Sequence, residues 1–267
     1  MVRYALLFLF AAASVSFSQK TRVACIGNSI TEGNMGGAYP VYLQEKLGDE
    51  YTVLNAGVSG TTLLKEGDKP YWVYGKLQDV FNFQPAIVTI KLGTNDTKSQ
   101  NWDNYGEHFK DDYNALIDTL ETLATSPTIF PVLPVPVFKL TYGIRNEIVD
   151  LIIPIINEIA EERELTIIDA NTPLKDYGYC FSDGVHPNNE GAEKIADVLF
   201  NALTAATGNI PVVHSRKYRS SERPRRYLTI IKRFNRNNSL LFNLNGRYIP
   251  GSGQTESSAS TLIAIPR

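Results

Sequence analysis

The chain has 267 residues, enough for one large domain or for one domain with an appendage. Its 43% hydrophobic and 20% charged residues, and the lack of an internal repeat of about 20–50 residues, exclude a chain disordered throughout and exclude solenoids and propellers. The net charge of −2 conceals an asymmetry, because residues 212–267 hold 11 Lys and Arg against two Glu, a charge of +9, and leave −11 on the rest. An acidic body joined to a basic stretch bears on the partners of the chain and not on its fold.

The N-terminal residues have the pattern of an export signal. Arg3 supplies a positive charge, residues 4–15 form a run rich in Leu, Phe and Ala, and small residues follow at Ser16 and Ser18. A membrane anchor and a lipoprotein signal are the alternatives, but the run is too short to span a bilayer about 30 Å thick, and no Cys follows it to carry a lipid. We therefore predict a signal peptide over residues 1–18, cleavage near Ser18, and a secreted (extracellular or periplasmic) protein without a transmembrane anchor.

The body of the chain alternates predicted strands and helices. Short apolar segments rich in β-branched residues predict five strands, over residues 21–26, 52–55, 87–92, 128–132 and 166–169. Helical spacing of apolar residues predicts four helices, over residues 40–47, 111–124, 146–163 and 188–207. Strands that are apolar without alternation favour a parallel sheet covered by helices on both faces, so the pattern predicts an α/β fold.

The chain has two cysteines, Cys25 and Cys180. Export would permit a disulfide between them, but Cys25 lies within an apolar predicted strand. We favour the interpretation that both are small packing residues.

Polar, glycine-rich segments directly follow three of the predicted strands, at residues 27–37, 57–62 and 93–97. Ligands of parallel sheets bind beyond the carboxyl ends of the strands, where such segments gather. The pattern therefore predicts a functional site at this edge of the sheet.

Each of these segments offers one candidate residue and one structural alternative. Ser29, in the sequence GNSIT, could be a nucleophile at a strand-to-helix turn or an ordinary helix cap. Gly60 could let a backbone N–H approach a substrate oxygen, or could only supply the positive φ of a turn. Asn95, in the sequence GTND, could donate its amide to an oxyanion or cap the next helix. Each segment alone leaves these alternatives open.

A fourth segment, DGVHP over residues 183–187, follows the fifth predicted strand and contains His186. Of the three histidines in the chain, His108 lies among Tyr105, Glu107 and Lys110 and is expected to be a surface or packing residue, and the third lies in the basic stretch. The tight turn from Asp183 to His186 can place the carboxylate against one imidazole nitrogen and leave the other nitrogen for Ser29. The alternative is a partly buried histidine at the start of a helix.

In this order, the GNSIT block, the Gly60 turn, the GTND block and the DGVHP block resemble the four blocks of the SGNH hydrolase (GDSL-type esterase/lipase) superfamily, over about residues 21–207. The resemblance implies a flavodoxin-like, three-layer α/β/α fold with a five-stranded parallel sheet, and a serine hydrolase that needs no cofactor. The residue before the nucleophile is commonly Asp in this superfamily and is Asn28 here, which leaves its local hydrogen bonding open but not the reaction class. The chain contains neither a Cys/His cluster nor an HExxH motif, so we also expect no catalytic metal.

The resemblance further implies a role for each candidate residue. Ser29 would be the nucleophile, His186 the general base, and Asp183 the residue that orients the base. The backbone N–H groups of Ser29 and Gly60 and the side chain of Asn95 would form the oxyanion hole.

The loop after the second block carries Tyr71 and Trp72 beside polar residues, which suits a substrate-binding role toward a sugar ring; packing of the loop is the alternative. The sequence also resembles bacterial sialate and xylan acetylesterases, and it contains no long apolar lid. We therefore predict a secreted esterase that removes O-acetyl groups from carbohydrates, with an acetylated carbohydrate as its partner and no nucleic acid. A lysophospholipase or arylesterase of the same superfamily and a non-catalytic glycan-binding module are the alternatives.

The composition changes after Pro211, which predicts a catalytic domain over residues 19–211 and a basic C-terminal tail or small module over residues 212–267. Within the tail, short strands are predicted over residues 227–234 and 240–244. The tail resembles C-terminal modules of secreted bacterial proteins, and a solvated tail is the alternative. Its charge predicts binding to an anionic polysaccharide or to the cell envelope.

Overall fold

The computed structural model describes residues 20–33, 36–206, 241–242 and 248–249. The predicted signal peptide with its cleavage site, the boundary near Pro211 and most of the basic tail lie outside the described residues. Apart from two short strands near the C-terminus, all described residues fall within the predicted catalytic domain.

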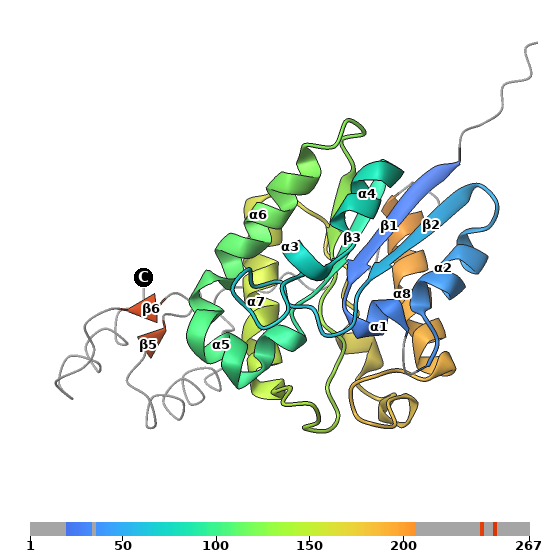
Figure 1. Cartoon of the computed structure of the whole chain (residues 1–267). Coiled ribbons are helices and arrows are strands. Elements are labelled where there is room, and N and C mark those ends of the chain that lie inside the picture. The colour runs from blue at the N-terminus through green and yellow to red at the C-terminus, as the bar shows by residue number, and fades with distance from the viewer. Residues whose placement is uncertain (1–19, 34–35, 207–240, 243–247, 250–267) are drawn as a thin grey trace, which may run out of the picture.

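A parallel four-stranded sheet lies at the centre of the structure, in the order β2-β1-β3-β4 (Figure 1). Its strands are β1 (Thr21–Gly27), β2 (Tyr51–Gly57), β3 (Ile87–Lys91) and β4 (Thr128–Pro131). β1 pairs with β2 on one side and with β3 on the other, so Gly27 at its end lies between Gly57 and Lys91. The connection after β1 leads to β2 on one side of β1, and the connection after β2 leads to β3 on the other side. Ligands of such sheets bind at the point where the direction of the connections reverses in this way. The predicted α/β fold with a parallel sheet is confirmed.

The fifth predicted strand, residues 166–169, forms a single parallel bridge, from Ile168 to the residue after β4. Ile168 N donates to Pro131 O (2.9 Å), and Leu133 N donates to Ile168 O (3.0 Å). The hydrogen bond before these two in the parallel ladder would have the nitrogen of Pro131 as its donor, and proline has no N–H. One step later, Ala170 N turns back and donates to Ile168 O (3.1 Å). The segment therefore lies beside β4 and adds a single bridge, and the sheet formed by the described residues has four strands, so the predicted five-stranded sheet is not confirmed.

The helices fall into a long group and a short group. The long helices overlap the four predicted ones, with bounds that differ by a few residues: α2 (Tyr39–Leu47), α6 (Phe109–Glu121), α7 (Asn146–Glu162) and α8 (Asn189–Ala206). The short helices were not predicted: α1 (Ser29–Glu32), α3 (Tyr71–Tyr74), α4 (Leu77–Phe83) and α5 (Ser99–Tyr105). One or two turns are too short to show a helical period in the sequence.

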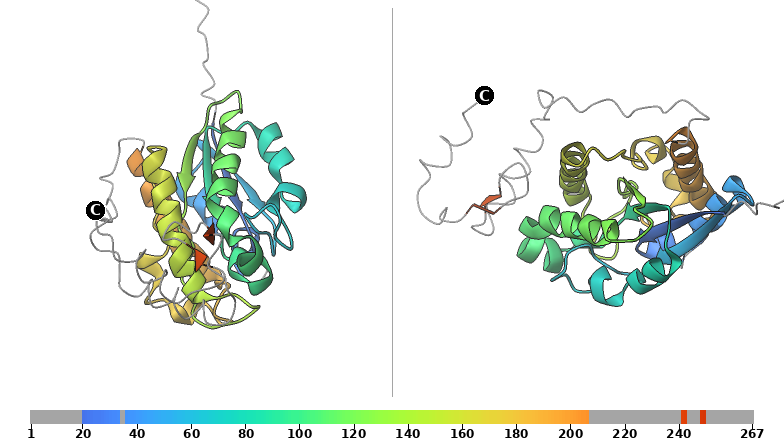
Figure 2. Two further views of the ribbon diagram at one scale, coloured as in Figure 1. Left: turned by 90° about the vertical axis from the view of Figure 1, so that its left-hand side faces the viewer. Right: turned by 90° about the horizontal axis from the view of Figure 1, so that it is seen from above.

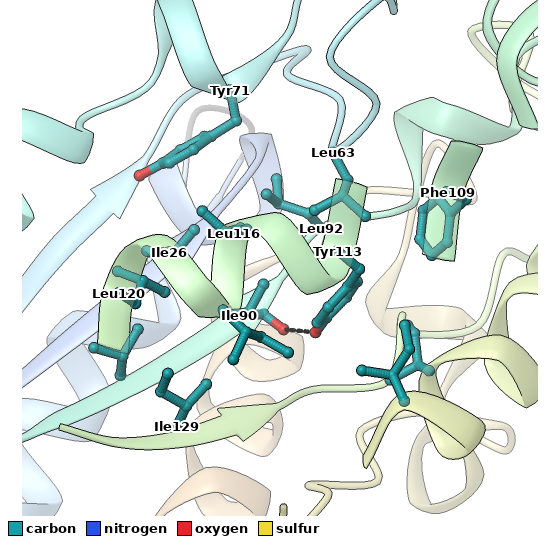
Figure 3. Close-up of a cluster of buried hydrophobic side chains, with 14 of the residues drawn as sticks. Ile26, Leu63, Tyr71, Ile90, Leu92, Phe109, Tyr113, Leu116, Leu120 and Ile129 are labelled. Carbon is teal, nitrogen blue, oxygen red and sulfur yellow. Dashed lines mark hydrogen bonds between the residues drawn. The ribbon is translucent and has the colours of Figure 1, made fainter. Parts of the chain in front are cut away.

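Alternate residues of β1 point into two cores on opposite faces of the sheet, because side chains alternate along a strand. Ala24 and Ile26 lie in the core that α6 and α7 complete, part of which is drawn in Figure 3. Val23 and Cys25 lie in the other core, together with residues of α2 and α8. Helices therefore cover the sheet on both sides, as the two further views in Figure 2 show, and the architecture is a three-layer α/β/α arrangement.

Cys25 and Cys180 are both buried, and both are free thiols. Burial raises the pKa of the Cys25 thiol to about 12, so this sulfur behaves as a small apolar group. The interpretation of both cysteines as packing residues is confirmed.

Near the C-terminus, β5 (Leu241–Phe242) pairs antiparallel with β6 (Tyr248–Ile249). β5 falls within the predicted strand at residues 240–244, whereas the strand predicted at residues 227–234 lies outside the described residues. In the described ranges, no helix is long and apolar enough to cross a membrane.

Candidate active site

The four sequence blocks come together at the carboxyl ends of β1, β2 and β3. Val58 N donates to Gly27 O (3.0 Å), which joins the second block to the first. The carboxylate of Asp96 accepts hydrogen bonds from the loop after the second block, which joins the third block to it. The fourth block reaches the first through a contact of 2.9 Å between the side chains of Ser29 and His186. The residues that the sequence separates widely thus form one site.

Ser29 is the first residue of α1 and does not cap this helix. The cap is Asn28, whose Oδ1 accepts a hydrogen bond from Ile30 N (3.1 Å). The Ser29 hydroxyl lies instead 2.9 Å from His186 Nε2. The N–H of Ser29 belongs to the first turn, where N–H groups have no acceptor within the helix. The capping alternative for Ser29 is therefore wrong, and its hydroxyl faces the imidazole.

Asn28 keeps the cap that an Asp would supply at this position, because its Oδ1 is the acceptor. The side chain is fully buried, and its Nδ2 has no hydrogen-bond partner in the part of the chain that the structure describes. The departure from the superfamily pattern thus leaves the turn before Ser29 intact and removes a negative charge from a position where desolvation would be costly.

The turn from Asp183 to His186 fixes the imidazole. Gly184 has a φ of +85°, which an L side chain rarely adopts. Asp183 Oδ1 accepts hydrogen bonds from Val185 N (2.9 Å) and His186 N (2.7 Å), and Asp183 Oδ2 lies 2.7 Å from His186 Nδ1. With the Nδ1 proton donated to Asp183, Nε2 is the acceptor for the Ser29 hydroxyl.

The carboxylate of Asp183 is held in its charged form. Partial burial raises its pKa, but the backbone N–H of His186, the imidazole and the N–H of Val185 outweigh this effect and lower the pKa to about 2. Asp183 is therefore ionised across the neutral pH range, where it can stabilise an imidazolium. The His186 and Asp183 side chains are 14% and 17% exposed, so the pair is shielded from water but remains accessible.

Gly60 and Asn95 lie in the loops that follow β2 and β3. Gly60 has a φ of +78°, and within the described part of the chain its N–H donates to no acceptor. Asn95 is 6% exposed and donates one Nδ2 proton to Thr61 O (3.1 Å). Its side chain caps no helix in the described structure, so the second Nδ2 proton is available to another acceptor. The two loops thus offer the kind of donors that an oxyanion hole requires.

Glu32, Lys69 and Asp96 hold these two loops, and the sequence analysis did not single them out. Their contacts are Ser59 N to Glu32 Oε2 (2.6 Å), Lys69 Nζ to Ser59 O (2.7 Å), Leu63 N to Asp96 Oδ2 (3.1 Å) and Leu64 N to Asp96 Oδ1 (2.8 Å). Burial raises the pKa of Asp96 to about 6, although its backbone N–H donors oppose this shift. The only sequence signal for Glu32 and Asp96 was position: Glu32 follows Ser29 by one helical turn, and Asp96 follows Asn95 directly.

Tyr71 lies in the core, which corrects the expectation that it contacts a sugar. It is 1% exposed, it lies among the buried side chains of Figure 3, and its hydroxyl donates to Ala56 O (2.6 Å). Trp72 is partly buried; its Nε1 donates to Leu63 O (2.9 Å), and Lys65 Nζ lies 4.5 Å from the centre of its ring. The packing alternative therefore describes Tyr71, and Trp72 is the one of the two with exposed surface.

His108 does not take part in this arrangement. The His108 side chain is 51% exposed and lies 3.7 Å from Glu107, as expected for a surface residue. His214 lies outside the described residues.

Comparison with known proteins gives a family and one curated relative. The model of the GDSL-like lipase/acylhydrolase family matches residues 25–194. An acetylxylan esterase of Xylanibacter ruminicola is 39% identical over 206 residues, which cover 68% of this chain and 43% of that protein. The chain therefore spans less than half the length of this relative.

Solved structures share the fold at lower identity. The acetyl xylan esterase AlAXEase is 21% identical, with a TM-score of 0.56 over 68% of this chain and 99% of that one. Est24, a carbohydrate acetylesterase from Sinorhizobium meliloti, is 19% identical, with a TM-score of 0.57 over 70% of this chain and 100% of that one.

Proposed function

The chain belongs to the GDSL-like lipase/acylhydrolase family, and from this membership and the site geometry we propose that it is a serine esterase that removes acetyl groups from carbohydrates. The observation that carries the proposal is the continuous series from Ser29 Oγ through His186 to Asp183 Oδ2, with contacts of 2.9 and 2.7 Å. A serine hydroxyl is a poor nucleophile until a base takes its proton, and neutral imidazole suits that role near neutral pH. An intact series of this kind argues against a binding module that has lost turnover.

In the acylation step, His186 Nε2 takes the hydroxyl proton as Ser29 Oγ attacks the acetyl carbon. The carbonyl oxygen becomes negative and accepts hydrogen bonds from the N–H groups of Ser29 and Gly60 and from Asn95 Nδ2. The ionised Asp183 stabilises the imidazolium. His186 then donates its proton to the sugar oxygen, which leaves as a hydroxyl group while the acetyl group stays on Ser29.

In the deacylation step, the same groups act on water. His186 Nε2 takes a proton from a water molecule, whose oxygen attacks the acetyl carbon on Ser29. The same donors stabilise the second oxyanion, and the return of the proton to Ser29 Oγ releases acetate. The sugar hydroxyl, acetate and one proton released to the solvent together account for the atoms of the ester and the water.

Replacing Asn95 with Ala should lower kcat for an acetate ester by about 10²–10³-fold and leave KM nearly unchanged, because this donor acts mainly on the transition state. Steady-state kinetics with p-nitrophenyl acetate measures both parameters. Asn104→Ala, which removes an exposed side chain on α5, is the matched control and should change neither. A loss confined to KM would make Asn95 a ground-state substrate contact instead.

An acetylated carbohydrate is the substrate class that the named relatives favour. Acetate release from acetylated xylan, with base-deacetylated xylan as the blank, tests the glycan directly. A pocket shaped for one acyl chain changes kcat/KM by about 10–200-fold for a single methylene. In parallel, kcat/KM for p-nitrophenyl esters should therefore be highest for acetate and should fall by about tenfold or more toward laurate. A preference for laurate would favour the lysophospholipase or lipase alternative and would contradict the acetylesterase.

We further propose that residues 1–18 direct export and that the basic tail over residues 212–267 tethers the enzyme to anionic surfaces. Clustered Arg and Lys attract acidic glycans and cell envelopes, and salt screens this attraction with a Debye length of ~10 Å at 0.1 M. The predicted catalytic domain contains every residue of the proposed mechanism, so tethering and turnover should be separable.

A chain shortened to end at Gly208 should hydrolyse p-nitrophenyl acetate about as well as the full mature chain. On an immobilised anionic polysaccharide, the full chain should be retained at low salt and released as salt rises, whereas the shortened chain should pass through. Equal retention of both forms would contradict the tether. Loss of activity in the shortened chain would place the tail within the folded domain.

A further inference from the structure

A segment that the sequence analysis did not single out lies along the loop that carries Asp183. We call this segment, residues 138–145, the strap. Three hydrogen bonds join the strap to the loop: Phe138 N to Gly184 O (2.8 Å), Lys139 Nζ to Ser182 O (2.9 Å) and Thr141 Oγ1 to Asp183 O. The approach is close, because a Cβ at Gly184 would lie 2.4 Å from Lys139 Cβ. The strap therefore follows the backbone of the loop on both sides of Asp183.

Tyr142 of the strap contacts both members of the Asp183–His186 pair. Its hydroxyl donates to Asp183 Oδ2 (3.1 Å), which is the oxygen that faces His186 Nδ1. Its ring meets the imidazole edge to face, with centroids 5.4 Å apart and an interplanar angle of 71°. The hydrogen bond to Asp183 raises the pKa of Tyr142, so the phenol keeps its proton and remains a donor.

Tyr142 adopts this position at a cost in backbone conformation and without the gain of burial. Its φ is +57°, in the left-handed region that a bulky side chain rarely occupies, and Gly143 follows with a φ of +73°. The side chain is 54% exposed, so packing in a core does not explain the conformation. Ile144 N donates to Thr141 O (3.0 Å) and closes a tight turn with Tyr142 and Gly143 at its centre, and this turn presents the Tyr142 side chain to Asp183 and His186.

The far end of the strap is anchored to the oxyanion side of the site. Arg145 N donates to Thr97 Oγ1 (3.0 Å), and Arg145 Nε donates to Thr97 O (2.6 Å). Thr97 closes the short 3₁₀ turn that begins with Asn95. One strap thus contacts the loop of the base and the turn of the oxyanion donor.

We propose that Tyr142 is a positioning residue for the general base. Its hydroxyl holds Asp183 Oδ2 against His186 Nδ1, and its ring limits rotation of the imidazole, so that Nε2 stays directed at Ser29. The proposal rests on the proposed esterase function, because it assigns Tyr142 to the same site. Tyr142 acts through Asp183 and His186 and not on the substrate.

Tyr142→Phe keeps the ring and removes the hydroxyl. We expect kcat for p-nitrophenyl acetate to fall by about tenfold with KM unchanged, the size of effect expected for one hydrogen bond to a charged group. Tyr179→Phe is the matched control, because the exposed Tyr179 also donates to a carboxylate, Glu190 Oε1 at 2.9 Å. This control should keep the wild-type kcat. An unchanged kcat in Tyr142→Phe, or a change confined to KM, would overturn the proposal.

A double-mutant cycle with Asp183→Ala separates positioning from a general structural role. If Tyr142 acts through Asp183, Tyr142→Phe should lower kcat by less than about twofold in the Asp183→Ala background. The same tenfold loss in both backgrounds would show that the hydroxyl acts on something other than Asp183, and the proposal would be wrong.

A spectroscopic measurement keeps this test independent of turnover. The proton between His186 Nδ1 and Asp183 Oδ2 should give a far-downfield resonance in ¹H NMR spectra of the full mature chain. Tyr142→Phe should shift this resonance or speed its exchange with water, and Tyr179→Phe should do neither. An unchanged resonance in Tyr142→Phe overturns the positioning role even if the wild-type protein hydrolyses no ester, an outcome that would by itself contradict only the proposed function.

Discussion

Ser29→Ala should abolish ester hydrolysis, with kcat reduced by roughly 10⁴-fold or more. The substitution removes the oxygen that attacks the acetyl carbon in the proposed mechanism but keeps the backbone N–H and the start of α1, since the cap of that helix is Asn28. The side chain is small and only partly buried, so the melting temperature should stay close to that of the wild-type protein. Kinetics with p-nitrophenyl acetate and a thermal melt followed by circular dichroism measure the two quantities.

Ser99→Ala is the matched control for this experiment. Ser99 is an exposed serine at the start of α5, so its replacement should change neither kcat nor the melting temperature. A host esterase could carry residual activity, and a mock purification from cells without the gene excludes that source. If Ser29→Ala still kept more than about a few per cent of the wild-type kcat, another residue would have to be the nucleophile.

The sequence alone predicts the elements whose evidence is local. The helix over α7 and the strand β3 are marked by dense apolar patterns, and both occur within a residue or two of their predicted bounds. The candidate site follows from topology, because polar blocks after parallel strands must meet at one edge of the sheet. The blocks alone could not distinguish a helix cap from a candidate nucleophile at Ser29. The structure excludes the cap, because Asn28 caps α1 and the Ser29 hydroxyl contacts His186, which lies 157 positions away in the chain.

The features that the sequence did not predict depend on tertiary contacts. Residues 166–169 have the composition of a strand, but the missing N–H of Pro131 limits their pairing, and this is visible only once the register is known. In the sequence, the polar neighbours of Tyr71 suggest that its ring could bind a sugar, yet Tyr71 begins the single turn of α3 and its side chain is buried in the core. Tyr142 lies far from every block in the sequence and reaches Asp183 only because the strap follows that loop.

His186→Ala should lower kcat by about as much as Ser29→Ala, because in the proposed mechanism the imidazole moves a proton in both acylation and deacylation. Without it, the Ser29 hydroxyl has no base at 2.9 Å, and the leaving sugar oxygen has no acid. Asp183→Ala should lower kcat by less than His186→Ala does, since the role proposed for Asp183 is to orient and stabilise the imidazole without itself exchanging the proton. Steady-state kinetics on all three single variants, with His108→Ala as the exposed histidine control, gives the ranking.

The double variant Ser29→Ala/His186→Ala decides whether the two residues act as a unit. Members of one catalytic unit are strongly non-additive, so the double variant should retain about the same residual rate as either single variant. That residual rate would come from substrate binding and from the oxyanion donors, which both substitutions leave in place. If the two losses instead multiplied, or if His186→Ala lost less than about tenfold in kcat, the base for Ser29 would have to be sought elsewhere, and the contact of 2.9 Å would be structural.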